Sequence, residues 1–130
     1  MPEARGTFQI DSWEGETYEE SEGAVLSRAS LTKTFLGDFE GSSSAELLLA
    51  EAQQGSRAYV GIERMDGTLN GAQGTFVVQH TATGNRGDDR ATVTVVPDSG
   101  TAGFSGITGS IAISVDEGGG HSYHFTYELA

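Results

Sequence analysis

One recurring motif restricts the folds that this chain can adopt. A large apolar residue, two glycines at fixed spacing and then alternating apolar residues occur at Leu69–Val78 and again, 35 residues later, at Phe104–Ile113. A looser copy begins at Phe39, with Ser44 in place of the second glycine and Glu46 in place of an apolar residue. Glycines in such segments favour bulges and sharp bends, and the alternation is typical of a strand with one buried face. The motif therefore predicts bent β-structure.

Period-2 alternation extends along most of the chain, whereas a helical period of 3.6 residues is nearly absent. Residues 45–53 consist of good helix formers, but they continue the copy that begins at Phe39, so we expect a strand there too. The expected strands are Thr7–Trp13, Val25–Phe35, Phe39–Gln54, Arg57–Met65, Thr75–Thr83, Ala91–Val96, Ile111–Val115 and Ser122–Leu129.

Glycine-bearing segments separate these strands. Asp66-Gly67 is a type I′ hairpin signal, and turns are also expected at Gly84–Asp89, Pro97–Gly100 and Gly118–Gly120. Five glutamates crowd Glu14–Gly23, and repulsion between like charges favours a solvated loop or edge there.

About eight short strands at even spacing indicate an up-and-down meander, and closing such a sheet removes its exposed edges. We expect an all-β fold: a single domain over residues 1–130 that forms a closed antiparallel eight-stranded up-and-down barrel. A β-sandwich is the alternative. The interior of a barrel of this size is either filled by side chains or holds one small ligand.

Composition excludes several classes of function. The net charge of −12 and only seven Lys and Arg residues argue against nucleic acid and anionic membranes as partners. The absence of cysteine excludes disulfides, thiolate nucleophiles and thiolate metal sites. No metal site is expected, because His121 and His124 point to opposite faces of a strand. Without an apolar run long enough to span a membrane or a signal peptide, a cytoplasmic protein is expected.

Polar and aromatic residues on the predicted strands are candidates for chemistry. Glu46 occupies the motif position of Phe76 and Ile111, so it would be an inward carboxylate with a raised pKa, suited to acid–base catalysis. Glu63 shares a strand face with Tyr59, and we expect Glu63→Gln to abolish turnover with little effect on melting. The predicted catalytic residues are Glu46, Glu63 and His121, and the predicted ligand-binding residues from the strands are Trp13, Tyr59, His80, Tyr123, Phe125 and Tyr127.

Structural roles compete with each of these. Strand glutamates are more often solvated or paired across the sheet, and an aromatic stripe is more often core packing. An error of one residue in register would exchange the two faces of a strand.

The chain resembles two related groups of proteins. Phe35–Asp38, Val78–His80, Phe104–Gly109 and Tyr123–Leu129 resemble parts of allene oxide cyclases. The whole chain more closely resembles a family of small bacterial proteins known as a domain of unknown function with an allene-oxide-cyclase-like barrel, of the calycin or dirigent type. The segments that carry this resemblance are Gly6–Phe8, Ser12–Glu14, Gly37–Gly41, Tyr59–Arg64, Gly74–His80 and Val96–Thr101.

The cyclase resemblance implies a cofactor-free site. Allene oxide cyclases hold an unstable epoxide in an apolar barrel and stabilise developing positive charge with a glutamate on the first strand. Gln9 matches that glutamate and Asp11 matches a neighbouring asparagine, which adds both residues to the predicted binding set. Gln9 offers a dipole without a full charge, and Asp11, on the same strand face, is the residue that could supply one.

Three functions follow as alternatives. The first is a cofactor-independent isomerase, cyclase or lyase acting on an apolar, oxygenated small molecule inside the barrel. The second is a carrier barrel that binds such a ligand without turnover, and the third is a structural, oligomeric module. A homo-oligomer is also expected, with Leu47 and Leu49 as the apolar face that a partner copy would cover.

Overall fold

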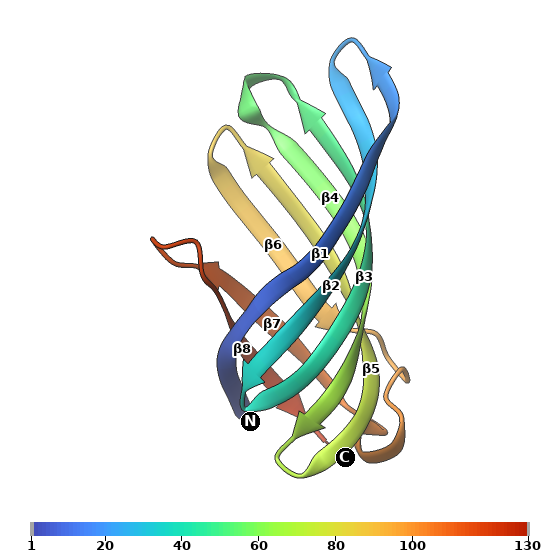
Figure 1. Ribbon diagram of the computed structural model, residues 1–130, viewed down its shortest axis with the longest axis vertical. Helices are drawn as coiled ribbons and strands as arrows, with labels where there is room; N and C mark the ends of the chain where they lie inside the picture. The colour runs from blue at the N-terminus through green and yellow to red at the C-terminus, as the bar shows by residue number, and fades with distance from the viewer. Residues whose placement is uncertain (1, 130) are drawn as a thin grey trace.

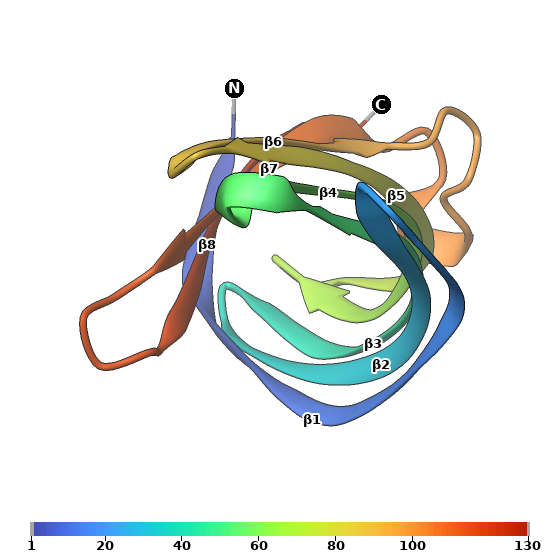
Figure 2. The same ribbon diagram turned by 90° about the horizontal axis from the view of Figure 1, so that it is seen from above.

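The computed structural model, which describes residues 2–129, forms a closed β-barrel with the strands in chain order (Figures 1 and 2). All strand pairs are antiparallel, and β1 pairs with both β2 and β8 to complete the ring. The predicted all-β, eight-stranded up-and-down barrel is confirmed. The strands are β1 (Glu3–Ser21), β2 (Ala24–Gly37), β3 (Phe39–Ala52), β4 (Arg57–Leu69), β5 (Ala72–Asn85), β6 (Asp88–Val95), β7 (Thr108–Val115) and β8 (His121–Glu128).

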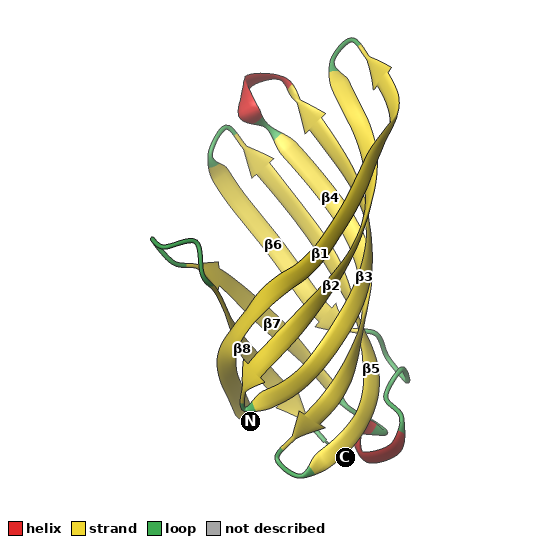
Figure 3. Ribbon diagram, viewed as in Figure 1, coloured by secondary structure: helices red, strands yellow, loops and turns green. Residues whose placement is uncertain are grey.

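In residues 2–129, helix is confined to two single turns at the ends of the barrel, η1 (Gln53–Gly55) and η2 (Ala102–Phe104) (Figure 3). Residues 45–53, where helix formers compete with the strand pattern, belong almost entirely to β3. Within the described part of the chain, neither helical turn has the length or the apolar character needed to cross a bilayer.

The strands differ in length, so the barrel is closed over part of its height. β1 to β5 have between 13 and 19 residues, whereas β6, β7 and β8 have 8 each. The β1–β2, β3–β4 and β5–β6 hairpins extend beyond the ring, and the β7–β8 hairpin turns away from them (Figure 1). β6 and β7 are paired at Thr94 and Ser110, the shortest ladder between the described strands.

Aromatic residues fill one end of the barrel. Both ends of the chain lie at this end (Figure 1). The Phe76 ring stacks on Phe125 at 5.7 Å between centroids, and Phe104 from η2 packs edge-on against Phe76 at 5.2 Å. A second, smaller apolar cluster lies toward the hairpin tips on β2 and β3, with Leu49 and Tyr59 packed against it; its members are Ala29, Leu31, Ala45 and Leu47. Leu47 and Leu49 therefore face the interior, and the expectation that they form the apolar surface for a partner copy is wrong.

The sequence motif corresponds to a repeated local structure at two of its three sites. Leu69 and Phe104 are both fully buried, and the glycines two positions later, Gly71 and Gly106, have φ angles of +81° and +82°. Each copy therefore consists of a buried anchor, a glycine in the left-handed region and a following strand.

The third copy is different. No turn interrupts β3 after Phe39, so strand alternation continues for seven residues and places Glu46 on the face opposite to Phe39. The expectation that Glu46 points into the barrel is therefore wrong.

The prediction of a turn at Asp66-Gly67 is also wrong. β4 continues to Leu69, and the hairpin turns at Asn70 and Gly71, whose φ angles are +50° and +81°. Gly67 instead allows neighbouring strands to approach: an added Cβ there would lie 2.3 Å from the carbonyl oxygen of Glu40. Both dipeptides carry the same local turn signal, so the pairing of β4 with β3 and β5 decides between them.

The acidic segment Glu14–Gly23 forms most of the outer arm of the first hairpin. β1 continues to Ser21 in register with β2, with bulges after Ile10 and Thr17, and the side chains of the arm are exposed. The like charges are tolerated in a strand because water surrounds them.

Candidate functional site

Four polar residues are buried inside the barrel, between the two apolar clusters. Lys33, Ser43, Glu63 and His80 come from β2, β3, β4 and β5, and their exposed fractions are 7%, 6%, 2% and 4%. Each of them lies on the inward face of its strand, because side chains alternate between the two faces and a residue two positions away is buried and apolar. We call these four residues the polar cluster.

The Glu63 carboxylate is the centre of the polar cluster. Ser43 Oγ donates to Oε2 at 2.5 Å, His80 Nε2 lies 2.6 Å from Oε1, and Lys33 Nζ lies 3.3 Å from both oxygens. Burial by itself would raise the pKa of Glu63, but the hydrogen bonds from His80 and Ser43 and the charge of Lys33 together lower it. Glu63 is therefore an anion at neutral pH, held in a site without water-exposed partners.

The contact with Glu63 determines how His80 can act. A carboxylate only accepts hydrogen bonds, so Nε2 of His80 carries the hydrogen, which leaves Nδ1 of a neutral ring as an acceptor. The Tyr59 hydroxyl lies 3.5 Å from Nδ1. Burial and the charge of Glu63 raise the pKa of Tyr59, so its hydroxyl keeps its proton.

Tyr59 contacts both the polar cluster and the apolar cluster on β2 and β3. It is half-buried and packs with Leu49 against the apolar cluster on β2 and β3. Glu63, His80 and Tyr59 thus form a chain of polar contacts that ends at an apolar wall.

His121 meets the polar cluster indirectly. Its ring stacks on Phe8 at 4.9 Å, and Lys33 Nζ lies 4.8 Å from the centroid of the same Phe8 ring. His121 is half-buried, and the Phe8 ring is its connection to Lys33.

The other aromatic candidates on β8 belong to the filled end of the barrel. Tyr123 accepts a hydrogen bond from the backbone N–H of Phe39 at 2.8 Å, and the Tyr127 hydroxyl accepts one from Asn70 at 2.6 Å. Together with Phe125 these residues are buried in the aromatic core. Trp13, on β1, is 52% exposed and pairs with Leu31 of β2.

The remaining predicted residues lie on the outer surface. Glu46 is exposed and accepts a hydrogen bond from Ser30. Gln9 and Asp11 are exposed as well; Asp11 accepts hydrogen bonds from Gln9 at 2.9 Å and from Thr34 at 2.5 Å. The structure thus brings together Tyr59, Glu63 and His80 and separates them from Glu46, Gln9 and Asp11.

Sequence reasoning missed Lys33 and Ser43. Lys33 lies between Leu31 and Phe35 on the apolar face of β2, and a lysine within an inward stripe is a signal of a buried charge that needs a partner. Ser43 offers no comparable signal, because serines are common on exposed strands. Among the described residues, no three His, Asp or Glu side chains are arranged to hold a metal ion.

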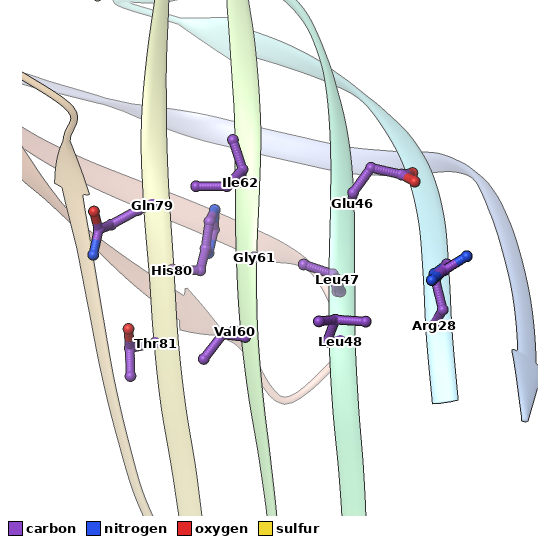
Figure 4. A pocket seen from close by; sticks show the side chains of 10 residues that line it. All are labelled: Arg28, Glu46, Leu47, Leu48, Val60, Gly61, Ile62, Gln79, His80 and Thr81. Carbon is purple, nitrogen blue, oxygen red and sulfur yellow. The ribbon is translucent and has the colours of Figure 1, made fainter. Parts of the chain in front are cut away.

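An open groove of about 510 Å³ lies on the outer face of the barrel, over β2 to β5 (Figure 4). The groove is lined mainly by residues whose side chains point outward, among them Arg28, Glu46, Leu48, Val60 and Ile62. A second hollow of about 250 Å³ shares Glu46 and Ile62 with the first.

Comparisons with known proteins agree with the fold, and the proteins that match have no assigned activity. No curated protein matches the chain. A solved structure from Shewanella oneidensis MR-1, described as a protein with unknown function from the DUF3224 family, is 36% identical with a TM-score of 0.91, and the alignment covers 100% of this chain and 98% of that one. The resemblance to allene oxide cyclases stays a prediction. Residues 4–127 match the family described as "Protein of unknown function (DUF3224)", and the chain therefore belongs to that family.

Proposed function

We propose that this barrel binds a small, apolar, oxygenated molecule and transfers a proton within it, as a cofactor-independent isomerase. The contacts of Glu63, His80 and Tyr59 carry this proposal. A buried ion pair contributes little to stability compared with apolar residues of similar volume, and perturbed ionisable groups concentrate at functional sites.

The arrangement supports a defined proton path. A substrate proton moves to the Tyr59 oxygen while the Tyr59 proton moves to Nδ1 of His80, which becomes an imidazolium. The Glu63 carboxylate, 2.6 Å from Nε2, stabilises that positive charge and holds the ring in the required orientation. Reversal of both transfers at a different substrate atom completes an isomerisation without net gain or loss of protons.

The surroundings of Tyr59 favour an apolar substrate that carries oxygen. Leu49 and the cluster on β2 and β3 offer an apolar wall next to Tyr59, and the hydroxyl of Tyr59 can hydrogen-bond to a carbonyl or hydroxyl oxygen. Binding of such a molecule without turnover is the alternative function, and the same residues would then serve only for recognition.

The experiment is hydrogen–deuterium exchange at carbon, with cyclic ketones and enones as probes, followed by NMR in D₂O. We expect the wild-type protein to accelerate exchange next to the carbonyl, and we expect Tyr59→Phe and His80→Gln to lose the acceleration. His124→Gln is the matched control, because His124 lies on the outside of β8 and pairs with Glu3.

The outcomes separate the alternatives. Binding of the probes that depends on Tyr59, without exchange, would replace the isomerase with a carrier barrel. Neither binding nor exchange, or equal exchange in the wild type and Tyr59→Phe, would overturn the proposal.

A further inference from the structure

We infer that two copies of this chain associate through one outer face of the barrel. This face, here called the β4 face, is the outward surface around the centre of β4 and the adjoining parts of its neighbouring strands. Its charged and large apolar residues are Arg28, Glu46, Leu48, Val60, Ile62, Arg64 and Val77.

The centre of the β4 face is apolar and exposed. Leu48, Val60 and Ile62 have exposed fractions of 46%, 50% and 53%. Register makes them contiguous, because Leu48 pairs directly with Val60, and Ile62 follows two positions later on the same side of β4. Apolar residues exposed together, rather than singly, are typical of surfaces that contact another molecule.

The β4 face is also hollowed. The two grooves, of about 510 and 250 Å³, share Glu46 and Ile62. The side chains around the larger groove come from β2 to β5 (Figure 4). Side chains of a partner can therefore insert into the face.

The distribution of charge selects a second copy as the partner. The chain carries 19 acidic residues and a net charge of −12, so most of its surface repels another copy. Among the residues named for the β4 face, Glu46 is the one acidic residue, and Arg28 and Arg64 carry positive charge. Two copies can thus meet here without opposing acidic surfaces.

These charges are self-complementary. In a two-fold dimer the same patch serves both copies, so Glu46 of one copy can face Arg28 or Arg64 of the other, and the reverse contact forms at the same time. Glu46 and Arg64 are diagonal neighbours on β3 and β4, because Glu46 pairs with Ile62 and Arg64 pairs with Ser44 in the next outward row. Ile62, in the row of Glu46, is then covered by the corresponding apolar residues of the partner.

The size of the β4 face sets the expected affinity. Strands about 4.8 Å apart and three outward residues per strand give a footprint of roughly 20 Å by 20 Å. That area is about half of the roughly 800 Å² per partner that standard interfaces bury, so we expect a weak dimer that forms with rising concentration.

Sedimentation velocity over a range of protein concentrations tests this inference. We expect the wild type to shift from monomer to dimer, and Ile62→Glu to remain monomeric while keeping its circular dichroism spectrum. Val115→Glu is the matched control, since Val115 is 63% exposed but lies on β7, away from the β4 face, and it should dimerise like the wild type.

Charge reversal distinguishes this interface from nonspecific contact. Glu46→Arg and Arg64→Glu should each raise the dissociation constant at least about tenfold, because each places like charges opposite one another. An equimolar mixture of the two variants should restore association, since both charge pairs are then complementary. A monomeric wild type at all concentrations, a dimer that survives Ile62→Glu, or a mixture no tighter than its components would overturn the inference.

Discussion

Nε2 of His80 lies 2.6 Å from Oε1 of Glu63, although the two residues are 17 positions apart on neighbouring strands. They are diagonal neighbours: Glu63 pairs with Val78, and His80 pairs with Gly61. Leu47 packs over Gly61, where an added Cβ would lie 2.3 Å from Cδ2 of Leu47. The relation couples a charged group in the core to both the stability and the proposed chemistry of the barrel.

Removing the positive partner of Glu63 should destabilise the fold strongly. Lys33→Met leaves a buried carboxylate without its cation, which costs about 3–5 kcal/mol of unfolding free energy. Urea denaturation measures the loss. Arg90→Met is the control: Arg90 contacts Asp88 with both side chains largely exposed, so its loss should cost less than about 1 kcal/mol. Equal effects of the two variants would show that the buried pair has no special role.

A matched double variant separates the charge from its packing. Lys33→Met combined with Glu63→Leu removes both buried charges and should recover much of the stability lost in the single variant. A double variant that is less stable than Lys33→Met would contradict this account of the polar cluster.

The stability contribution of Glu63 should depend on pH. Because the pKa of Glu63 in the folded protein is lower than its ordinary value of 4.5, its ionised form favours folding. The stabilisation by ionised Glu63 is fully present above pH 4.5, the ordinary pKa, and is lost as the pH falls through the lowered pKa of the folded protein. The difference in unfolding free energy between the wild type and Glu63→Gln should therefore be constant near neutral pH and shrink in acid.

Urea titrations at a series of pH values provide the measurement, and a difference that grows in acid would contradict the lowered pKa.

The contact with Lys33 also changes the expectation from the strand pattern that Glu63→Gln has little effect on melting. Since this substitution leaves Lys33 buried without a counter-charge, we now expect a substantial fall in melting temperature.

Two glycines on the same hairpin should differ in their tolerance of alanine. At Gly71 the φ of +81° costs an alanine about 1 kcal/mol, and no atom lies within 4 Å of the added Cβ. At Gly67 the added Cβ would lie 2.3 Å from the backbone oxygen of Glu40, which cannot move without distorting β3. Thermal melting should therefore show a larger loss for Gly67→Ala, and the reverse order would contradict the assigned turn.

The segment between β6 and β7 should contribute to the core although it is a loop. Phe104 is fully buried against Phe76, so Phe104→Ala should cost about 3–5 kcal/mol in urea denaturation. Leu36→Ala is the control, because Leu36 is 58% exposed and its truncation should change stability by about 0.5 kcal/mol or less. A Phe104→Ala variant as stable as this control would mean that the loop does not close the barrel.

The alternation of apolar and polar residues, together with the glycine-bearing turns between the strands, was sufficient to predict the barrel and part of the candidate site. Tyr59 and Glu63 are four positions apart on one strand, so their common face follows from local geometry. The same rule failed for Glu46, because the repeat at Phe39 lacks the turn that resets the face in the copies at Leu69 and Phe104.

The sequence by itself determined the strands, their antiparallel order and the apolar stripes, because each depends on residues a few positions apart. Tertiary structure alone decided that Lys33, Ser43 and His80 meet at Glu63, since strand register and closure set which residues of different strands become neighbours. It also decided that Asn70-Gly71, and not Asp66-Gly67, forms the turn, because only the close approach of β3 to β4 distinguishes two equal local signals.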